Sequence, residues 1–316
     1  MSSTNYKSTG SPHSNKTPNF VHKVTHTYKL EWPTLLLFFA VYTLWLGTTL
    51  LHEHLPWYLT LIPLIYIVAL HSSLQHEVIH GHPTAFTHLN KTLAFPALGL
   101  LVPYERYEIL HLQHHRNWLL TDPYDDSESY FLAAKQWARL SNPVRQLFLF
   151  NNTLVGRLSI GPAIMFTKMI ASEWQLAKHN TDIRISWLFH FIAVALAITW
   201  LLYVDFSLWY YLAFVAYPAT SLLMLRAYSE HLPEEAIENR SAIIKSNAAM
   251  RLLYLNNNFH RVHHNHPELA WYQLPRKYHE HYADQTTHVY SGYWQLFKQF
   301  GFTPRYSVEH PFLARD

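Results

Sequence analysis

The chain contains no cysteine, and this absence excludes several kinds of site at once. Without thiols it can form no disulfide, no iron–sulfur cluster and no thiolate-bound metal. Any metal site must therefore use imidazole or carboxylate ligands. Charged residues are also scarce, at 14% of 316 residues, whereas a soluble domain has about 25%. The net charge of +3 is too small to indicate binding to nucleic acid.

Apolar residues and histidine are present in excess. Hydrophobic residues make up 49% of the chain, and its 24 histidines outnumber the 21 aspartates and glutamates together. Four apolar stretches carry no charge, and each is near the ~20 residues that a helix needs to span a bilayer. They lie at 34–51, 57–75, 186–204 and 208–225. Short connectors join them in two pairs, which fits buried helices of a large soluble protein poorly. We therefore expect an all-α integral membrane protein with four transmembrane helices in two hairpins.

The distribution of lysine and arginine predicts the orientation in the membrane. Neither connector holds a basic residue, whereas the N-terminal tail, the middle segment and the C-terminal segment do. By the positive-inside rule, both termini and the middle segment are cytoplasmic. We expect a disordered tail (1–30) before a single membrane domain (31–316). That domain consists of hairpin 34–75, cytoplasmic segment 76–185, hairpin 186–225 and cytoplasmic segment 226–316. Two further apolar stretches, 93–103 and 160–170, are too short to span and are expected at the membrane interface.

Three histidine clusters lie in the segments predicted to be cytoplasmic. The first has the spacing HxxxH, and the other two read "HLQHH" and "HRVHH". Residues at i, i+3 and i+4 share one side of a helix, and imidazole is a common metal ligand. One such motif alone is as easily a helix surface, but three on one predicted side of the membrane indicate a metal site. The eight residues are His76, His80, His111, His114, His115, His260, His263 and His264.

The first cluster also contains the string H-E-x-x-H, in "LQHEVIHGHP", which is typical of zinc proteases. A catalytic zinc ion takes three protein ligands and keeps one position open, so eight clustered histidines are too many for it. Gly81 directly after His80 also favours the end of the helix there. Two metal ions, each bound by about four imidazoles, would employ all eight histidines, whereas one zinc ion would employ three. Imidazole alone suits zinc, copper or iron, so the residues leave the metal open.

The layout HxxxH, HxxHH, HxxHH between two apolar hairpins resembles the membrane fatty acid desaturase and hydroxylase superfamily. The resemblance covers about residues 32–278, and its wording is similar to that of bacterial proteins of the fatty acid desaturase type. It includes the strings "QHEVIHGHPT", "VPYERYEILHLQHHR", "LTDPYDDSESY", "RAYSEH" and "NNNFHRVHHNHPELAWYQLP". It implies two non-haem iron ions as cofactor, with O2 as co-substrate. It also adds His231, in "SEHLPEE", to the eight clustered histidines as a ligand.

The resemblance implies an O2-dependent oxidoreductase that uses two electrons to desaturate a fatty acyl chain. A hydroxylase or ketolase of a lipid, alkane or carotenoid on the same site is the alternative. A membrane metal-binding or transport protein is a third interpretation, but the apolar stretches offer it only His71 and His190 as ligands. No haem domain, flavin-binding glycine motif or cysteine-ligated centre is visible. We therefore expect a separate electron donor of the ferredoxin, rubredoxin or cytochrome type, besides membrane lipids and a long apolar substrate.

Polar residues near the clusters are expected to orient the rings, because a ligating imidazole usually donates its second N–H to a carboxylate or carbonyl. The alternative for each is a solvated polar surface. The candidates are Glu77, Glu108, Asp122, Asp125, Asp126, Glu230 and Asn256. His71, His82 and His266 also lie near the clusters, but we expect them to be buried polar or capping residues rather than ligands.

Overall fold

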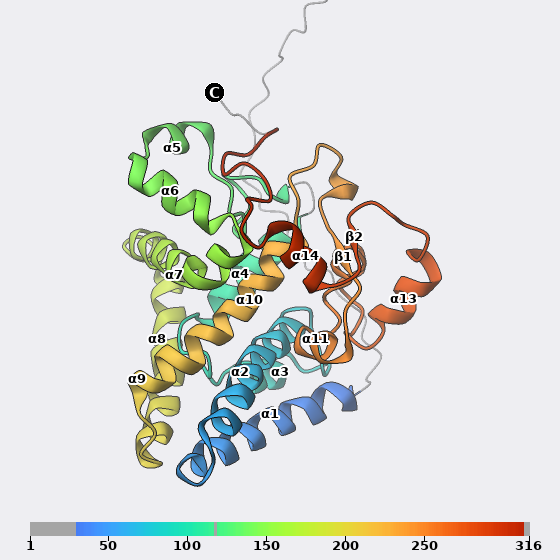
Figure 1. The fold of residues 1–316 in the computed structure, drawn as a ribbon. Coiled ribbons are helices and arrows are strands. Elements are labelled where there is room, and N and C mark those ends of the chain that lie inside the picture. Colours follow the sequence, from blue (N-terminus) through green and yellow to red (C-terminus); the bar gives the residue numbers. More distant parts are fainter. Residues whose placement is uncertain (1–29, 117–118, 313–316) are drawn as a thin grey trace, which may run out of the picture.

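The computed structural model describes residues 30–116 and 119–312, so the tail expected to be disordered lies, apart from Leu30, outside the described residues. Regular structure in the described residues is almost entirely helical, as the sequence predicted (Figure 1). A single small sheet is formed by β1 (Ile243–Ile244) and β2 (Val289–Tyr290), which pair in parallel.

Four long helical segments run between the two ends of the molecule, and each contains one of the predicted apolar stretches. They are α1 (Trp32–Leu50), α2 (Trp57–Ile79), α8 (Thr181–Tyr203) and a last segment made of α9 (Leu208–Tyr211), the π-helical turn η3 (Leu212–Ala216) and α10 (Tyr217–Glu230). The 3₁₀ turn η1 (His52–His54) joins α1 to α2. In Figure 1 the first hairpin is blue, and the second descends in yellow and returns in orange.

The two hairpins pack side by side with their connectors together. The ring of His52, in the first connector, lies 4.7 Å from that of Phe206 in the second, measured between centroids. Near this end, Trp200 Nε1 donates a 2.9 Å hydrogen bond to Thr49 Oγ1. The opposite ends of α2 and α10 lead directly into histidine-bearing segments. The four segments therefore run from a connector end to a histidine end.

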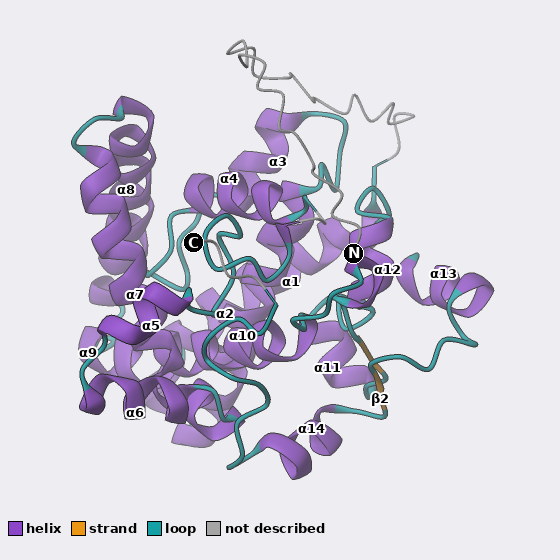
Figure 2. Ribbon diagram, turned by 90° about the horizontal axis from the view of Figure 1, so that it is seen from above, coloured by secondary structure: helices purple, strands orange, loops and turns teal. Residues whose placement is uncertain are grey.

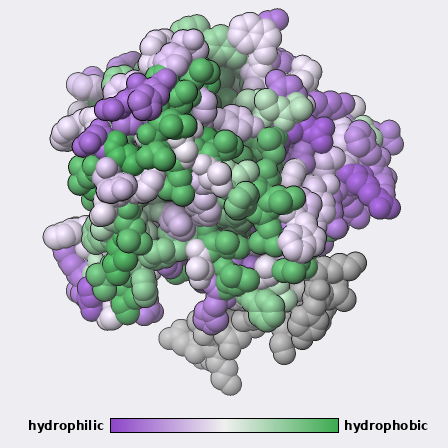
Figure 3. Space-filling model, turned by 90° about the horizontal axis from the view of Figure 1, so that it is seen from below, coloured by the Kyte–Doolittle hydropathy of each residue, from purple (hydrophilic) through white to green (hydrophobic). Residues whose placement is uncertain are grey.

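The long helices bury one face against each other and expose apolar residues on the other. Inside, Phe38, Leu64 and Tyr211 are at most 1% exposed. Outside, large apolar side chains are uncovered, and Phe39 is 71% and Leu196 62% exposed. Figure 3 shows such residues as broad green areas over the lower face. So much exposed apolar surface is rare on soluble proteins and fits contact with lipid.

Within the described residues, five helices rather than four are long and apolar enough to cross a membrane, so the expected count is not confirmed. The fifth is α7 (Leu154–Ala177), a helix of 24 residues that contains the stretch 160–170. The stretch alone is too short to span, but the helix that contains it is not. The sequence pattern did not reveal this length because Arg157, Lys168 and Glu173 interrupt the apolar run, although the helix continues through them.

Both ends of α7 contact the histidine end of the molecule. Near its start, the guanidinium of Arg157 lies 4.2 Å from the ring centroid of Tyr130. Near its end, Glu173 forms an ion pair with Arg106, whose Nε lies 2.7 Å from Glu173 Oε2. Arg106 belongs to α4 (Tyr104–His114), the helix of the second histidine cluster. Helix α7 therefore lies along the histidine end, whereas the other four segments lead away from it.

The apolar stretch 93–103 begins in the last two residues of the short helix α3 (Thr87–Ala94) and continues as irregular chain, packed among the long helices. Irregular backbone in such surroundings needs hydrogen-bond partners from the protein. Tyr211 Oη donates to the carbonyl of Leu98 at 2.8 Å, and His190 Nε2 lies 3.2 Å from that of Leu100. Side chains from the second hairpin thus hold this segment in place.

The remaining elements form a cap over the histidine end, which Figure 2 shows from above. They are α5 (Ala134–Arg139), α6 (Asn142–Asn151), η4 (Ile237–Asn239), α11 (Ala248–Leu253), α12 (His260–Asn265), α13 (Leu274–His281) and α14 (Tyr293–Phe300). The segment after α14 returns to the loop that follows α4. There the N–H of Leu132 donates to Val308 O at 2.9 Å, and that of His310 to Leu132 O at 3.1 Å.

Candidate metal centre

Nine histidines gather in two groups, and they are the nine that the sequence analysis singled out. In each group, one ring nitrogen per residue lies within 4.8 Å of all the others. One group, the five-histidine cluster, consists of His76, His80, His111, His115 and His263. The other, the four-histidine cluster, consists of His114, His231, His260 and His264. The structure thus brings together residues that are up to 188 positions apart in the chain, from His76 to His264.

Helical spacing explains how each HxxHH motif contributes to both clusters. On α4, His111 and His115 are four residues apart and enter the five-histidine cluster, while His114 enters the other. On α12, His260 and His264 are the pair four residues apart, and they enter the four-histidine cluster. Residues at i and i+4 share a helix face more closely than i and i+3. Each motif therefore spans two adjacent sites.

The Nε2 atoms of four histidines of the five-histidine cluster face one another. His111 Nε2 lies 3.2 Å from His80 Nε2 and 3.0 Å from His115 Nε2. His115 Nε2 lies 3.1 Å from His263 Nε2. Around a tetrahedral ion with bonds of about 2.1 Å, neighbouring nitrogens would be about 3.4 Å apart. The observed spacing is therefore close to that of ligands around one ion.

In the four-histidine cluster, the positions of the ring nitrogens favour a positive charge between them. His231 Nε2 lies 2.8 Å from both His114 Nε2 and His260 Nε2. The other nitrogens of these rings face acceptors: His114 Nδ1 is 2.8 Å from Asp126 Oδ1, and His231 Nδ1 is 3.2 Å from the carbonyl of Arg240. If each Nδ1 carries the proton, lone pairs meet at Nε2, and only a proton or a metal cation between them removes the repulsion. The donor set therefore fits a bound cation.

Electrostatics favours the same arrangement. Burial lowers the pKa of most cluster rings well below the ordinary value of 6.5, and their neighbours lower it further, so these rings are neutral at pH 7 and can bind metal. Outside the long helices, the rings with a pKa lowered in this way are those of His80, His115, His231, His260, His263 and His264. His114 differs: burial opposes its charge, but Glu128 and Asp126 raise its pKa to about 9. The carboxylates thus favour a positive charge at the four-histidine cluster. Either a proton or a metal ion can carry that charge, and the metal ion displaces the proton when it binds.

Two of the carboxylates expected to orient rings do so. Asp126 contacts His114, and Glu230 Oε1 lies 3.3 Å from His260 Nδ1. Glu230 also pairs with Arg226 one turn earlier on α10, at 2.7 Å from its Nε, so two buried charges compensate each other beside the cluster.

The other carboxylates that the sequence suggested have different partners. Glu108 pairs with Lys91 at 2.5 Å. Glu77, in the H-E-x-x-H string, is buried and accepts a 3.0 Å hydrogen bond from the N–H of Trp271. Asp122 and Asp125 lie in the loop after α4, where Asp122 Oδ1 accepts from both Tyr124 N and Asp125 N. In these positions they shape the surroundings of the clusters.

The expectation for Asn256 was wrong by one position. Asn256 accepts a 2.9 Å hydrogen bond from Arg251 Nε, whereas its neighbour Asn257 contacts two cluster histidines. Asn257 Oδ1 lies 3.1 Å from His260 Nδ1, and its Nδ2 lies 3.4 Å from His76 Nε2. The expectation assumed a helix from Asn256 onward, but Asn256 has a φ of 55° and α12 begins only at His260.

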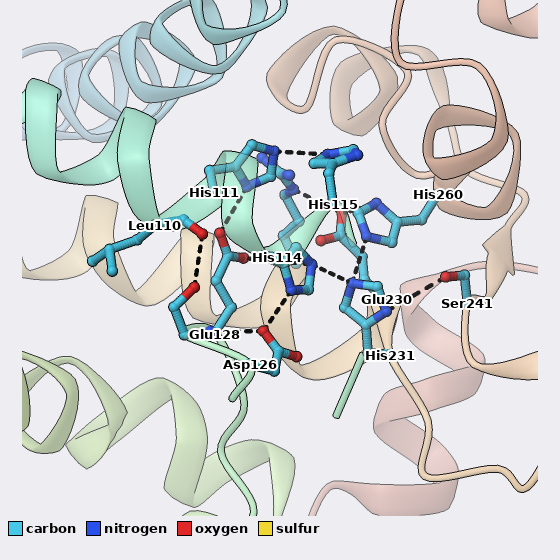
Figure 4. A network of polar contacts seen from close by, with 12 residues as sticks. Leu110, His111, His114, His115, Asp126, Glu128, Glu230, His231, Ser241 and His260 are labelled. Carbon is cyan, nitrogen blue, oxygen red and sulfur yellow. Dashed lines mark hydrogen bonds and ion pairs between the residues drawn. The ribbon is translucent and has the colours of Figure 1, made fainter. Parts of the chain in front are cut away.

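Glu128 is a site residue that the sequence analysis did not select. Its Oε1 lies 2.7 Å from His111 Nδ1, and its Oε2 lies 3.9 Å from His114 Nε2, so it touches both clusters (Figure 4). The residue stands in the string "LTDPYDDSESY", which carried the family resemblance. Loop geometry, rather than helical spacing, brings it back to α4, and spacing rules therefore could not find it.

Three histidines were expected not to bind metal, and they lie outside both clusters. His71 Nε2 is 3.0 Å from Tyr42 Oη, and His82 Nδ1 is 2.6 Å from Glu31 Oε1. His266 Nδ1 lies 3.5 Å from Glu268 Oε1. The contact between His82 and Glu31 ties the start of α1 to the segment that follows α2.

Comparison with known families gives a match over most of the chain. A family model described as fatty acid desaturase matches residues 54–297, which include both histidine clusters. The chain belongs to the fatty acid desaturase family. A search among curated proteins found none that matches it. The match and the clusters together indicate an oxidoreductase with a two-metal centre in a membrane protein.

In this desaturase-family protein the two histidines of the H-E-x-x-H string belong to the five-histidine cluster. His76 and His80 share it with three histidines from two other segments, whereas a catalytic zinc ion takes three protein ligands. Glu77 is held by Trp271, as described above, so its carboxylate is committed to the protein backbone.

Proposed function

We propose that the chain is a membrane-bound di-iron oxidoreductase that uses O2 and two electrons to desaturate a fatty acyl chain. The observation that carries this proposal is the pair of buried clusters, which holds nine histidines in a chain of the fatty acid desaturase family. The five-histidine cluster would hold one iron and the four-histidine cluster the other. When bound, the two irons would supply the redox chemistry that activates O2.

The protein would supply position, protonation state and exclusion of water. Asp126 and Glu128 accept hydrogen bonds from the Nδ1 atoms of His114 and His111, and Glu230 lies beside His260 Nδ1, so the opposite nitrogens face the cluster centres. The rings of His111 and His114 are each 1% exposed, and such burial shields reactive species from bulk water. An acyl chain would reach this centre from the lipid side, between the apolar helices.

We further propose how this family member sits in the membrane. Segments α1, α2, α8 and α9–α10 would cross it, because each runs between the connector end and the histidine end. Helix α7 would lie along the surface at the histidine end, since both its ends contact residues there. With four spans, segments 76–185 and 226–316 share one side, which the basic residues favour as cytoplasmic. A separate ferredoxin, rubredoxin or cytochrome would deliver electrons from that side.

The test combines metal analysis with lipid analysis on the full chain. The protein, purified in detergent, is expected to contain two irons per chain, and a host that expresses it should accumulate a new double bond in its acyl lipids. His260→Ala should abolish the new lipid, while His281→Ala, at an exposed position on α13, should not. One zinc per chain would contradict the proposal. A new hydroxyl or keto group in the lipid would assign the centre to a hydroxylase or ketolase instead.

A further inference from the structure

We propose that Glu128 is a tenth metal ligand, which completes the four-histidine site with a carboxylate oxygen. This inference rests on the proposed two-metal function and extends it. The histidines alone divide unevenly, five against four. A carboxylate on the smaller set would give both ions five protein donors, and carboxylate oxygen is a regular ligand of non-haem iron.

The distance between Glu128 and His114 is short enough for both to bind one ion. Two donors at about 2.1 Å from a common ion cannot lie more than about 4.2 Å apart, whatever the angle between them. Glu128 Oε2 lies 3.9 Å from His114 Nε2, the ring nitrogen that faces the four-histidine cluster. The oxygen is therefore within ligand spacing of that nitrogen without any movement of the chain.

The second oxygen of Glu128 ties the two sites together. Its Oε1 lies 2.7 Å from His111 Nδ1, and the other nitrogen of that ring faces the five-histidine cluster. One carboxylate would thus bind one ion and orient a ligand of the other. Figure 4 shows Glu128 between His111 and His114, which come from adjacent faces of α4.

Both oxygens of Asp126 and one oxygen of Glu230 have partners in the protein, and the approach to His114 Nε2 favours Glu128 as the carboxylate ligand. Asp126 uses Oδ1 for His114 Nδ1, on the far side of that ring, and Oδ2 for the N–H of Thr121. Glu230 Oε1 is shared between Arg226 and His260 Nδ1. In the described part of the chain, Glu128 Oε2 makes no hydrogen bond, and it lies 3.9 Å from His114 Nε2.

The loop that carries Glu128 is clamped on both sides of this residue. Ser127 Oγ donates a 2.7 Å hydrogen bond to Leu110 O on α4, and Ser129 Oγ donates a 2.9 Å hydrogen bond to Thr121 O. The N–H of Glu128 itself donates to Asp126 Oδ1 at 3.0 Å. Such clamping reduces the conformational entropy that a ligand side chain loses on binding metal.

A small cavity next to the residue gives the carboxylate room. Its volume is ≈ 20 Å³, and its lining includes Glu128, Glu230 and His231. That is space for about one water molecule. Glu128 can therefore adjust its oxygen toward the ion without displacing packed side chains.

The test uses the purified full chain with cobalt(II) as a spectroscopic probe, because its d–d absorption reports coordination number. Glu128→Gln keeps the size of the side chain but removes the charge. We expect it to weaken one of the two cobalt sites by more than about 100-fold, beyond the 10–100-fold typical of a partner that only orients a ligand. The remaining cobalt at that site should absorb more strongly, as expected for a lower coordination number.

Asp126→Asn is the matched control, because Asp126 contacts His114 on the side away from the metal. It should weaken binding only to the extent typical of orienting partners and leave the d–d spectrum unchanged. An infrared difference spectrum between metal-free and cobalt-loaded wild-type protein, with ¹³C-labelled glutamate, does not depend on a variant folding. A metal-dependent shift of a glutamate carboxylate band is expected.

Two results would overturn the inference: no carboxylate shift in the wild-type spectrum, or a Glu128→Gln protein whose spectrum and affinity match those of Asp126→Asn. Either result would leave Glu128 as an orienting partner of His111 alone. A wild-type chain that binds no pair of metal ions would be a different failure, that of the proposed function, and metal analysis distinguishes the two.

Discussion

Arg106 on α4 and Glu173 on α7 form a two-point ion pair within the protein. Arg106 Nε lies 2.7 Å from Glu173 Oε2, and a second guanidinium nitrogen lies 2.9 Å from Oε1. The two side chains are 7% and 5% exposed. Trp187 Nε1 on α8 donates to Glu173 Oε2 at 3.1 Å. The pair therefore joins the helix that carries His111 and His114 to α7 and to the second hairpin.

Removing one partner of this pair should destabilise the fold and loosen the metal centre. Glu173→Gln leaves the Arg106 charge buried and uncompensated, a change that typically costs about 3–5 kcal/mol. We expect a lower thermal midpoint and a lower metal content, because α4 loses an anchor. The double variant Arg106→Met/Glu173→Leu should recover much of the stability, since no unpaired charge remains. Equal midpoints for the single and double variants would contradict this account.

The division of the adjacent residues His114 and His115 between two clusters predicts separable effects of their removal. His231→Ala and His114→Ala should each empty mainly the four-histidine site, which is left with three histidines. His115→Ala leaves four histidines in its cluster and should weaken that site less. Metal analysis after dialysis against a weak chelator measures both effects. Identical loss of both ions in His114→Ala and His115→Ala would show that the sites are not distinct.

The sequence reveals those parts of the fold that follow from local patterns. Four apolar stretches predict four of the long segments, because uncharged residues in runs of this length need a bilayer or a core. Helix α7 does not follow the pattern because partners from other segments hold its charged side chains: Arg157 lies over the ring of Tyr130, and Glu173 pairs with Arg106. Which charges pair across the fold is a tertiary property, and a run of residues does not contain it.

The same distinction holds for the candidate site. Spacing along a helix identifies eight of the nine clustered histidines, and the family resemblance adds His231. Spacing fails for Asn257 and Glu128, since both lie in loops whose backbone conformation decides where the side chains point. The left-handed conformation of Asn256 and the clamped loop around Glu128 are consequences of contacts with distant segments.

The hydroxyl of Tyr211 should contribute to stability through two buried hydrogen bonds. It accepts from Trp45 Nε1 at 2.8 Å and donates to Leu98 O at 2.8 Å. Tyr211→Phe leaves both partners unsatisfied, and each buried unpaired group costs about 1–3 kcal/mol. Tyr210→Phe is the matched control, because that hydroxyl has no hydrogen bond in the described part of the chain. A thermal midpoint equally low in both variants would refute the role of these bonds.

His310 should make the attachment of the C-terminal segment sensitive to acid. Its Nδ1 accepts a 3.2 Å hydrogen bond from the N–H of Phe312, and its Nε2 lies 3.1 Å from Thr121 Oγ1, so the neutral ring fits this position. Burial lowers the pKa of His310 from 6.5 to about 4, and nearby Arg240 lowers it further than Asp122 raises it. Because the detached segment binds the proton more readily, the attachment is fully stable above about pH 6.5 and weakens as the pH falls toward 4.

Hydrogen exchange measures this directly as a function of pH. Amides of residues 302–312, and of the loop around Thr121, should exchange faster between pH 6.5 and 4, while α2 and α10 change less over the same range. His310→Gln removes the titrating group, so its C-terminal exchange should depend less on pH, apart from the intrinsic pH dependence of exchange itself. A variant with the same pH profile as the wild type would place the sensitivity elsewhere, and the cluster histidines, which must stay neutral to bind metal, would then be the first groups to test.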